Sequence, residues 1–484
     1  MHRLSRVLAV PLLCTLASSP ALAQHGGPGP ETYDLVIANG RVIDPESGLD
    51  AVRSIGIRSD RIVTIAEGPL RGARVIDAAG LVVAPGFIDL HRHGQDEENY
   101  RYAVLDGVTT GLELEVGVGD VDAWYREREG GQLINYGAAV GHIPVRMAVL
   151  GDPGEFLPSG PGADQPASPE QIAEIVRRID RGLREGAIAV GLGTAYTPAA
   201  SRDEIIEVLR VAARHGASAH IHTGGPLRGI IGAIEAAAEA GAALHIVHIN
   251  STAGSRIGEM LDTVSAARAR GQDVTTEAYP YAASATRIES ALYDDWESQP
   301  DEWFQAFEWP ETGERLTRET FAKYRAVGGT VIRHGNREEN VRIAIASPLT
   351  MIASDGGPNR DGKGHPRGAG SFTRVLGRYA RDEGVLTLAD ALAKMTIMPA
   401  RRLEARVPEM KDRGRIRAGA FADLVIFDPD RVIDRATYRE PVLPPDGMRY
   451  VIVNGVPVVE NGRIVEGVRP GRAIRAPITA GATR

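Results

Sequence analysis

The middle of the chain alternates short apolar runs with amphipathic segments, and this alternation constrains the fold more than any other feature. The apolar runs have the length of strands, and the segments between them carry apolar residues at helical spacing. Arg202–His215 follows Ser201 as an N-cap and stops at Gly216, and Ile230–Ala240 stops at Gly241. Apolar strands that alternate with such helices predict a parallel sheet covered by helices.

Eight apolar runs of strand length lie between residues 86 and 354, and their number predicts a closed barrel. The expected strands are Gly86–Leu90, Val108–Glu115, Leu133–Val140, Ala187–Leu192, Ala217–His222, Ala243–Ile249, Asp273–Tyr279 and Met351–Ser354. Further helices are expected at Gln171–Glu185 and Ile257–Arg270, each followed by a glycine. This α/β pattern fits a (β/α)8 TIM barrel, with a doubly wound open sheet as the alternative.

Both ends of the chain carry short β-rich segments that are separated by glycine-rich turns. They occupy residues 31–84 and return in residues 413–470. Neither end is long enough to bury a large core alone, so we expect one small β-sandwich built from both ends. The barrel then takes residues 85–412, with a linker at 24–30 before the first β segment and a tail at 471–484.

A long insertion is expected at residues 285–345, before the last barrel strand. It holds Trp296, Trp303 and Trp309, three of the four tryptophans. Insertions of this kind often form a lid over an active site. The aromatic residues could equally fill a small core of the insertion's own, and both interpretations can hold together.

Residues 1–23 have the pattern of a secretory signal peptide. Arg3 and Arg6 precede the apolar run Val7–Ala17, and Ala21 and Ala23 are the small residues that a signal peptidase reads. The run is too short to span a bilayer, so no membrane span is expected. We expect a periplasmic or secreted protein after cleavage near Ala23.

The charge and cysteine content limit the partners and the metal ligands. The net charge of −8, without any run of basic residues, argues against nucleic acid and leaves a small-molecule substrate as the expected partner. The only cysteine, Cys14, lies within the signal peptide. A metal in the mature protein must therefore be held by His, Asp or Glu.

Histidines and acids gather where the predicted strands end, which is where TIM barrels carry their active sites. His91 and His93 end the first strand and point to the same face, so both can reach one cation. The other candidates at strand ends are Glu113, Glu115, His220, His222, His248 and Asp355. A lone histidine there is usually a hydrogen-bonded core residue, but several strands converging in this way predict a metal site.

The segment Pro85-Gly86-Phe87-Ile88-Asp89-x-His91-x-His93 resembles the first-strand motif of the amidohydrolase superfamily. From about residue 33 to 460 the chain is more narrowly similar to the D-aminoacylases, or N-acyl-D-amino-acid deacylases. The stretches that carry this similarity are Gly107–Thr110, Val140–His142, Arg210–Gly216, Ala219–Ile221, Val247–Ile249, Tyr279–Tyr281, Ser354–Gly356, His365–Arg367 and Gly419–Val425.

The resemblance implies a zinc enzyme with one or two divalent metal ions. His91 and His93 would bind one ion, His220 and His248 the other, and Asp355 would be both a metal ligand and the catalytic acid. Arg367 and Tyr281 would hold the α-carboxylate of the substrate.

The chain departs from the family at three positions. The family often has a cysteine ligand on the second strand, where this chain offers Glu115, with Glu113 as the alternate; a carboxylate can bridge two ions. Asn250 replaces a lysine that contacts the substrate carboxylate, and His222 stands where an arginine is common. His142 or His222 could also stabilise the oxyanion, although His142 could equally be a core residue.

The reaction implied is hydrolysis of a linear amide, most simply of an N-acyl-D-amino acid to a carboxylate and a free D-amino acid. Asp355 would take a proton from the attacking water and deliver it to the leaving amine. The alternatives are a hydrolase of cyclic amides, of the hydantoinase or dihydroorotase type, and a dipeptide hydrolase. A cyclic-amide enzyme commonly carries a carbamylated lysine on the fourth strand, and Ala187–Leu192 contains no lysine. A binding scaffold without catalysis is less favoured, because the ligand residues are present.

Overall fold

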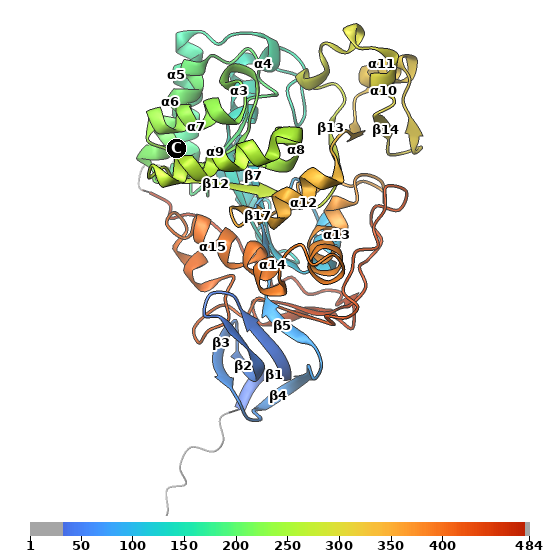
Figure 1. Cartoon of the computed structure of the whole chain (residues 1–484). Helices are drawn as coiled ribbons and strands as arrows, with labels where there is room; N and C mark the ends of the chain where they lie inside the picture. Colours follow the sequence, from blue (N-terminus) through green and yellow to red (C-terminus); the bar gives the residue numbers. More distant parts are fainter. Residues whose placement is uncertain (1–31, 480–484) are drawn as a thin grey trace, which may run out of the picture.

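The computed structural model describes residues 32–479 (Figure 1). The predicted signal peptide and the linker at 24–30 lie outside this range. Among the helices within it, none combines the length and apolar character that a bilayer crossing requires.

A parallel sheet of eight strands forms a TIM barrel, and each strand coincides with one of the eight predicted from the sequence. The strands follow the chain order around the sheet, from β6 to β12 and then β17. They are β6 (Phe87–Asp89), β7 (Val108–Val118), β8 (Asn135–Gly141), β9 (Val190–Gly193), β10 (Ser218–His222), β11 (Ala243–Ile246), β12 (Val274–Ala278) and β17 (Thr350–Ile352).

The two end strands of this sheet meet just beyond their carboxyl ends. The backbone N–H of His93, after β6, donates to the carbonyl of Gly356, after β17, at 2.9 Å. The backbone N–H of Ser354 donates to the carboxylate of Asp89 at 3.0 Å. The ring therefore closes at the edge where the predicted site residues lie, which excludes the doubly wound alternative.

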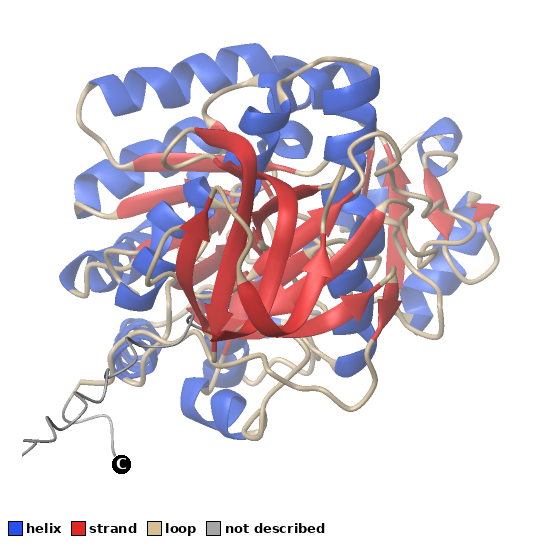
Figure 2. Ribbon diagram, turned by 90° about the horizontal axis from the view of Figure 1, so that it is seen from below, coloured by secondary structure: helices blue, strands red, loops and turns tan. Residues whose placement is uncertain are grey.

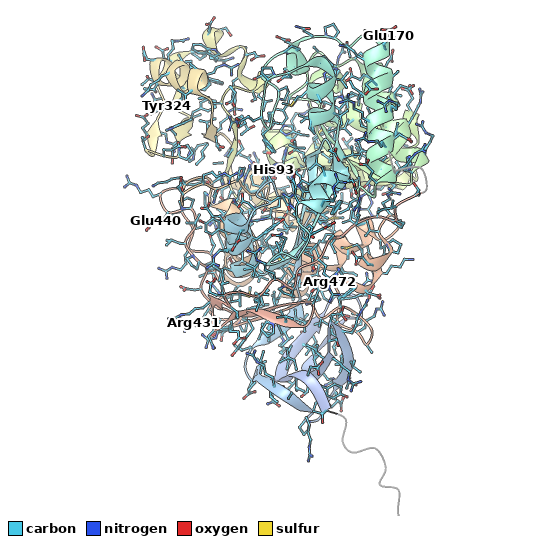
Figure 3. All side chains as sticks on the ribbon, turned by 180° about the vertical axis from the view of Figure 1, so that it is seen from behind. His93, Glu170, Tyr324, Arg431, Glu440 and Arg472 are labelled. Carbon is cyan, nitrogen blue, oxygen red and sulfur yellow. The ribbon has the colours of Figure 1, made fainter. Side chains whose placement is uncertain are left out.

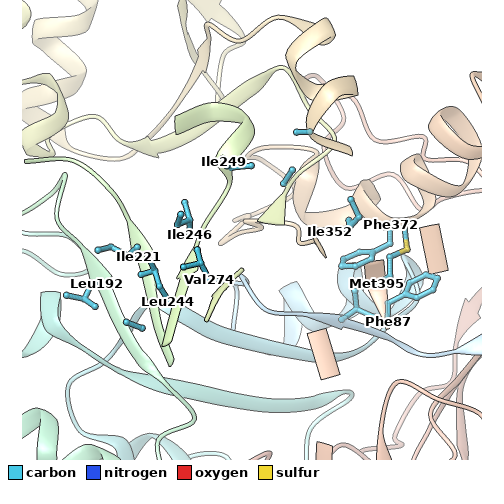
Figure 4. Close-up of a cluster of buried hydrophobic side chains, with 14 of the residues drawn as sticks. Phe87, Leu192, Ile221, Leu244, Ile246, Ile249, Val274, Ile352, Phe372 and Met395 are labelled. Carbon is cyan, nitrogen blue, oxygen red and sulfur yellow. The ribbon is translucent and has the colours of Figure 1, made fainter. Parts of the chain in front are cut away.

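Helices cover the outside of the barrel, and the four helices predicted by periodicity are present. They are α5 (Pro169–Arg184), α6 (Arg202–Arg214), α7 (Ile230–Ala240) and α9 (Ile257–Ala269). The other helices are α1 (Glu97–Leu105), α2 (Val121–Arg126), α3 (His142–Leu150), α4 (Pro161–Asp164), α8 (Ile249–Ala253), α12 (Glu338–Ala346), α13 (Arg367–Arg374), α14 (Leu388–Met395) and α15 (Ile397–Leu403). The core between sheet and helices includes Leu192, Ile221, Leu244, Ile246 and Val274 from four neighbouring strands (Figure 4).

Both chain ends contribute to a second sheet of nine strands, as predicted. Its strands are β1 (Thr32–Asp44), β2 (Leu49–Arg58), β3 (Arg61–Ala66), β4 (Arg71–Asp77), β5 (Val82–Pro85), β18 (Leu424–Phe427), β19 (Met448–Val453), β20 (Val456–Glu460) and β21 (Arg463–Ile464). The two ends join where β5 pairs antiparallel with β18. All nine strands are hydrogen-bonded as one sheet, which lies in front of the barrel when the molecule is seen from below (Figure 2).

The predicted insertion forms a small unit beside the barrel mouth. Its antiparallel sheet consists of β13 (Ala283–Arg287), β14 (Phe307–Trp309), β15 (Glu314–Arg315) and β16 (Thr330–His334), accompanied by α10 (Asp301–Phe304) and α11 (Arg318–Val327). Trp309, Phe304, Phe307 and Phe321 are buried together, with Trp296 and Trp303 packed against them. The aromatic residues thus form the insertion's own core. Helix α12, at the end of the predicted range, packs in the barrel core instead.

Residues 471–479, assigned from the sequence to a tail, lie against the barrel. The backbone N–H of Ile474 donates to the carbonyl of Tyr136 on β8 at 2.7 Å, and the hydroxyl of Tyr125 donates to the carbonyl of Ile474 at 2.7 Å. The side chain of Ile474 is fully buried. This segment therefore contributes to the core of the fold.

Replacing Ile474 with alanine should lower the free energy of unfolding by about 2–5 kcal/mol, because the substitution leaves a cavity under the barrel. Ile478 is 59% exposed and provides a matched control, for which Ile478→Ala should change stability by no more than about 0.5 kcal/mol. Denaturant unfolding of both variants measures the difference. Equal effects would show that the segment does not pack as described.

Candidate metal centre and active site

A cavity of about 540 Å³ opens at the carboxyl ends of the barrel strands. Residues of the insertion line the rim of this cavity. Its floor is lined by His93, Glu115, His222, His248 and Asp355. His93 lies near the middle of the molecule, below the insertion that carries Tyr324 (Figure 3). The cavity is thus placed where TIM-barrel enzymes bind their substrates.

One group of potential metal ligands consists of His91, His93 and Glu115. The Oε2 atom of Glu115 lies 3.0 Å from Nε2 of His91 and 3.1 Å from Nε2 of His93. The two Nε2 atoms are 3.1 Å apart. Three donor atoms from β7 and the loop after β6 therefore face one point.

A second group consists of Glu115, His222 and His248. The other carboxylate oxygen of Glu115, Oε1, lies 3.0 Å from Nδ1 of His222. That nitrogen is 3.1 Å from Nε2 of His248. Glu115 is shared by both groups, which is the geometry of a carboxylate that bridges two cations.

The structure corrects one predicted ligand, because it places His222 rather than His220 in the second group. Both side chains face the barrel interior, as residues two apart on a strand do. The strand rises about 3.3 Å per residue, so His220 lies a layer deeper. Its ring packs on that of His245 with centroids 4.6 Å apart, and its Nε2 is 3.1 Å from the hydroxyl of Ser218.

Two buried carboxylates lie behind the first pair of histidines. Oε2 of Glu113 is 2.7 Å from Nδ1 of His93, so the alternate ligand Glu113 supports His93 and does not replace Glu115. Oε1 of Glu277 is 2.6 Å from Nδ1 of His91. Glu277, on β12, was missed by the sequence analysis, although an acid within an apolar strand was the same signal that identified Glu115.

The donor set fits a divalent cation. When Glu277 and Glu113 accept the Nδ1 protons, the Nε2 lone pairs of His91 and His93 and the oxygen of Glu115 all point at each other. Such an arrangement is repulsive unless a positive charge lies between the three atoms. Burial lowers the pKa of His91, but the carboxylates of Asp355 and Glu277 outweigh burial and raise the pKa to about 10. The raised pKa shows that the surrounding acids favour a positive charge at this point.

The surroundings of His248 favour its neutral form, which is the form that binds a metal ion. Its Nδ1 lies 3.0 Å from the hydroxyl of Thr252, which leaves Nε2 toward His222. Burial, together with the neighbouring His222, lowers the pKa of His248 to about 3. The imidazole therefore keeps a free lone pair at neutral pH.

Asp355 lies beside the first group and is held ionised. Its Oδ1 is 3.4 Å from Nε2 of both His91 and His93, and its Oδ2 is 2.7 Å from Nη1 of Arg367. Burial raises the pKa of Asp355, but the positive charge of Arg367 outweighs burial and lowers it below the ordinary value. The carboxylate can therefore accept a proton at the edge of the metal position.

Comparison with known proteins places this site in a family. The model of the amidohydrolase family matches residues 74–459. The chain belongs to the amidohydrolase family. This amidohydrolase is 33% identical to the N-acyl-D-glutamate deacylase of Alcaligenes xylosoxydans xylosoxydans, over 92% of this chain and 97% of that protein. It is 32% identical to the D-aminoacylase of the same organism, over 92% and 98% of the two chains.

Solved structures share its fold. The N-acyl-D-glutamate deacylase of Bordetella bronchiseptica, complexed with zinc and a phosphonate inhibitor, superposes with a TM-score of 0.80 at 28% identity, covering 92% of this chain and 100% of that one. A D-hydantoinase from Bacillus sp. AR9 reaches a TM-score of 0.60 at 18% identity over 92% and 99% of the two chains, and indicates the fold alone.

On the substrate side of the amidohydrolase cavity, the structure places Tyr279 where Tyr281 was predicted. The guanidinium of Arg367 lies 4.9 Å from the ring centre of Tyr279, and both residues line the cavity. Tyr281 lines a different cavity, with its hydroxyl 3.5 Å from Asp434 and its ring under Arg374. The two tyrosines flank Pro280, and only the first reaches the metal side.

Two other predicted substrate contacts do not line the cavity. The side-chain amide of Asn250 donates to the carbonyl of Tyr279 at 3.1 Å and so fixes the loop after β12. Nε2 of His142 is 2.8 Å from Glu204, a carboxylate that also binds Arg146, and all three are buried. His142 is therefore a core residue, and His222, the other oxyanion candidate, lies among the potential metal ligands instead.

Three further arginines near the barrel mouth differ in position, since two line the cavity and one lies outside it. Arg287 and Arg333, both from the insertion, line the cavity. Arg287 pairs with Glu289 at 2.6 Å. Arg360 pairs with Asp96 at 3.0 Å and lies outside the cavity lining.

The correction at strand β10 can be tested by metal analysis. His222→Asn should lose the second metal ion while keeping the first, because it removes a ligand of the second group only. His220→Asn is the matched control from the same strand and should keep the full metal content. The opposite result, with loss in the His220 variant, would contradict the assignment of His222.

Proposed function

We propose that this amidohydrolase removes the acyl group from N-acyl-D-amino acids, giving a carboxylate and a free D-amino acid. One observation carries the proposal. Glu115 belongs to two groups of potential metal ligands, and the ionised Asp355 lies beside the first group. The overall similarity to deacylases over 92% of the chain supports the choice of substrate.

The metal positions follow from the donor groups. His91, His93 and Glu115 would hold one divalent ion, with Asp355 beside it, and Glu115, His222 and His248 would hold the other. Zinc suits these nitrogen and carboxylate ligands. Bound there, the metal supplies a nucleophilic water at neutral pH and polarises the amide carbonyl.

The protein's own part in the reaction is proton transfer and orientation. Asp355 accepts the proton of the attacking water on Oδ1, because Oδ2 is occupied by Arg367. It then delivers the proton to the leaving nitrogen, which departs as the amine. Arg367 and Tyr279 stand side by side on the cavity wall, where they receive the carboxylate of the amino acid.

A cyclic-amide substrate is less well supported. Strand β9 and the residues before it, 187–193, carry no lysine that could form a carbamate. Glu115, which belongs to both ligand groups, would bridge the two ions instead. A dihydroorotase of Syntrophotalea carbinolica is 25% identical over 82% of this chain, less than the deacylases. Hydrolysis of dipeptides stays an outcome of the substrate test.

The proposal is tested with metal-analysed protein and a panel of N-acetyl-D- and N-acetyl-L-amino acids, scored by release of free amine. Activity on D-substrates that a chelator abolishes, and that added Zn²⁺ restores, is expected. Metal-loaded protein that releases no amine from any member would reject the deacylase assignment and turn the search to dipeptides and cyclic amides.

Asp355→Asn should lower kcat by about 10²–10⁴-fold, because the amide cannot accept the proton of the attacking water. The metal content should be largely retained, since the ligand histidines and Glu115 are untouched. Turnover and metal content are measured on the same preparation. Near-normal turnover would remove Asp355 from its catalytic role.

We also propose that the enzyme is exported, on the basis of the pattern in residues 1–23. The periplasm or the medium should contain a mature chain that begins near Gln24, as read by N-terminal sequencing. A chain that keeps its first 23 residues in the cytoplasm of a bacterial host would contradict export.

A further inference from the structure

Below the metal centre, the buried carboxylate of Glu277 contacts two histidines. One is the metal ligand His91, and the other is His245, which belongs to neither ligand group. Glu277 is 1% exposed and does not line the cavity. Its Oε1 lies 2.6 Å from Nδ1 of His91, and its Oε2 lies 3.0 Å from Nε2 of His245. Nδ1 of His245 is in turn 2.8 Å from the hydroxyl of Thr275.

These contacts form a chain of hydrogen bonds in which the donors converge on the carboxylate of Glu277 from both sides. Glu277 accepts only, so both histidines donate to it, His91 from Nδ1 and His245 from Nε2. A neutral His245 then accepts the hydroxyl proton of Thr275 on Nδ1. Burial lowers the pKa of His245, which agrees with the neutral form. The chain ends at Nε2 of His91, whose lone pair faces the first metal position.

We propose that Glu277, held in place by His245, is a positioning residue that fixes His91 with its proton on Nδ1 and so sets the metal affinity of the first position. A carboxylate behind a metal-binding imidazole fixes its tautomer and ring orientation and raises its basicity. The inference rests on the proposed metal centre and does not depend on the identity of the substrate.

Two of the other ligand histidines, His93 and His248, are supported in different ways, which makes the role of His245 specific to His91. Glu113, behind His93, is fixed by the backbone, because its Oε1 accepts the N–H groups of Val116 and Gly117 at 3.1 and 3.2 Å. Within residues 32–479, the groups hydrogen-bonded to Nδ1 of His248 are the hydroxyls of Thr252 and Ser251. Loss of Glu277 should therefore weaken the first metal position and spare the second.

The test is a titration of the metal-free full-length protein with Co²⁺, in which visible absorption reports each ligand set and competition with a chelator reports affinity. Glu277→Gln keeps the shape of the side chain and removes its charge. We expect the first position to bind Co²⁺ about 10- to 100-fold more weakly, with an altered spectrum, and the second to be unchanged. Glu277→Asp should restore part of the affinity.

Glu204→Gln is the matched control, since Glu204 is also a buried carboxylate bonded to a histidine, His142, away from the metal centre. It should leave both metal affinities unchanged. If Glu277→Gln does not fold, His245→Gln serves in its place, because it keeps the charge of Glu277 and removes its support. A smaller loss of affinity, confined to the first position, is then expected.

Two results would overturn the inference. One is wild-type affinity and spectrum at the first position in a folded Glu277→Gln protein, which would leave Glu277 a purely structural role. The other is equal weakening of both positions, which would indicate general loosening of the barrel. Because the readout is metal binding, it is separate from the substrate test: a protein that binds Co²⁺ normally but hydrolyses none of the panel contradicts the proposed function and leaves this inference standing.

Discussion

The carboxylate of Glu115 is the constraint on which the rest of the site depends. It is 2% exposed, and its two oxygens face four histidines from three different parts of the barrel. A buried carboxylate is costly unless it is paired, and here the pairing groups are metal ligands rather than a single counter-ion. The buried Glu113 and Glu277 are paired with the ligand histidines His93 and His91, and Asp355 is paired with Arg367. A positive charge between the two ligand groups would therefore stabilise this group of acids.

The closure of the barrel sheet also holds part of the site together. The hydrogen bond from His93 to Gly356 joins the first strand to the last, and it brings His91 and His93 to within 3.4 Å of Asp355. Asp355 itself has φ 51°, a left-handed conformation that is unfavourable for most residues. The closure and the ion pair with Arg367 hold it there, so the fold supplies the strain that directs the carboxylate toward the metal position.

Much of the fold was predictable because it follows from local periodicity. The eight strands and four of the helices were identified from apolar spacing and from glycines at helix ends, which depend on neighbours in the chain. That both ends join in one β domain followed from the short length of each end, whereas the pairing of β5 with β18 came from the structure. The packing of residues 471–479 was not predictable, since nothing in a polar, proline-containing segment shows that Ile474 fills a gap beside β8.

The sequence by itself determined the barrel, the family and the residue types of the metal centre, because these rest on periodicity and on motifs that are contiguous in the chain. Only the tertiary structure decided which members of those motifs meet. His220 and His222 share a face and a residue type, and Tyr279 and Tyr281 share a motif. Depth along the barrel axis separates His222, among the metal ligands, from the deeper His220, and the turn at Pro280 separates Tyr279, on the wall of this cavity, from Tyr281, on the wall of another. The role of Glu277 becomes visible only when β12 lies beside β11, where His245 contacts it, and its carboxylate reaches His91 at the end of β6, on the other side of β17.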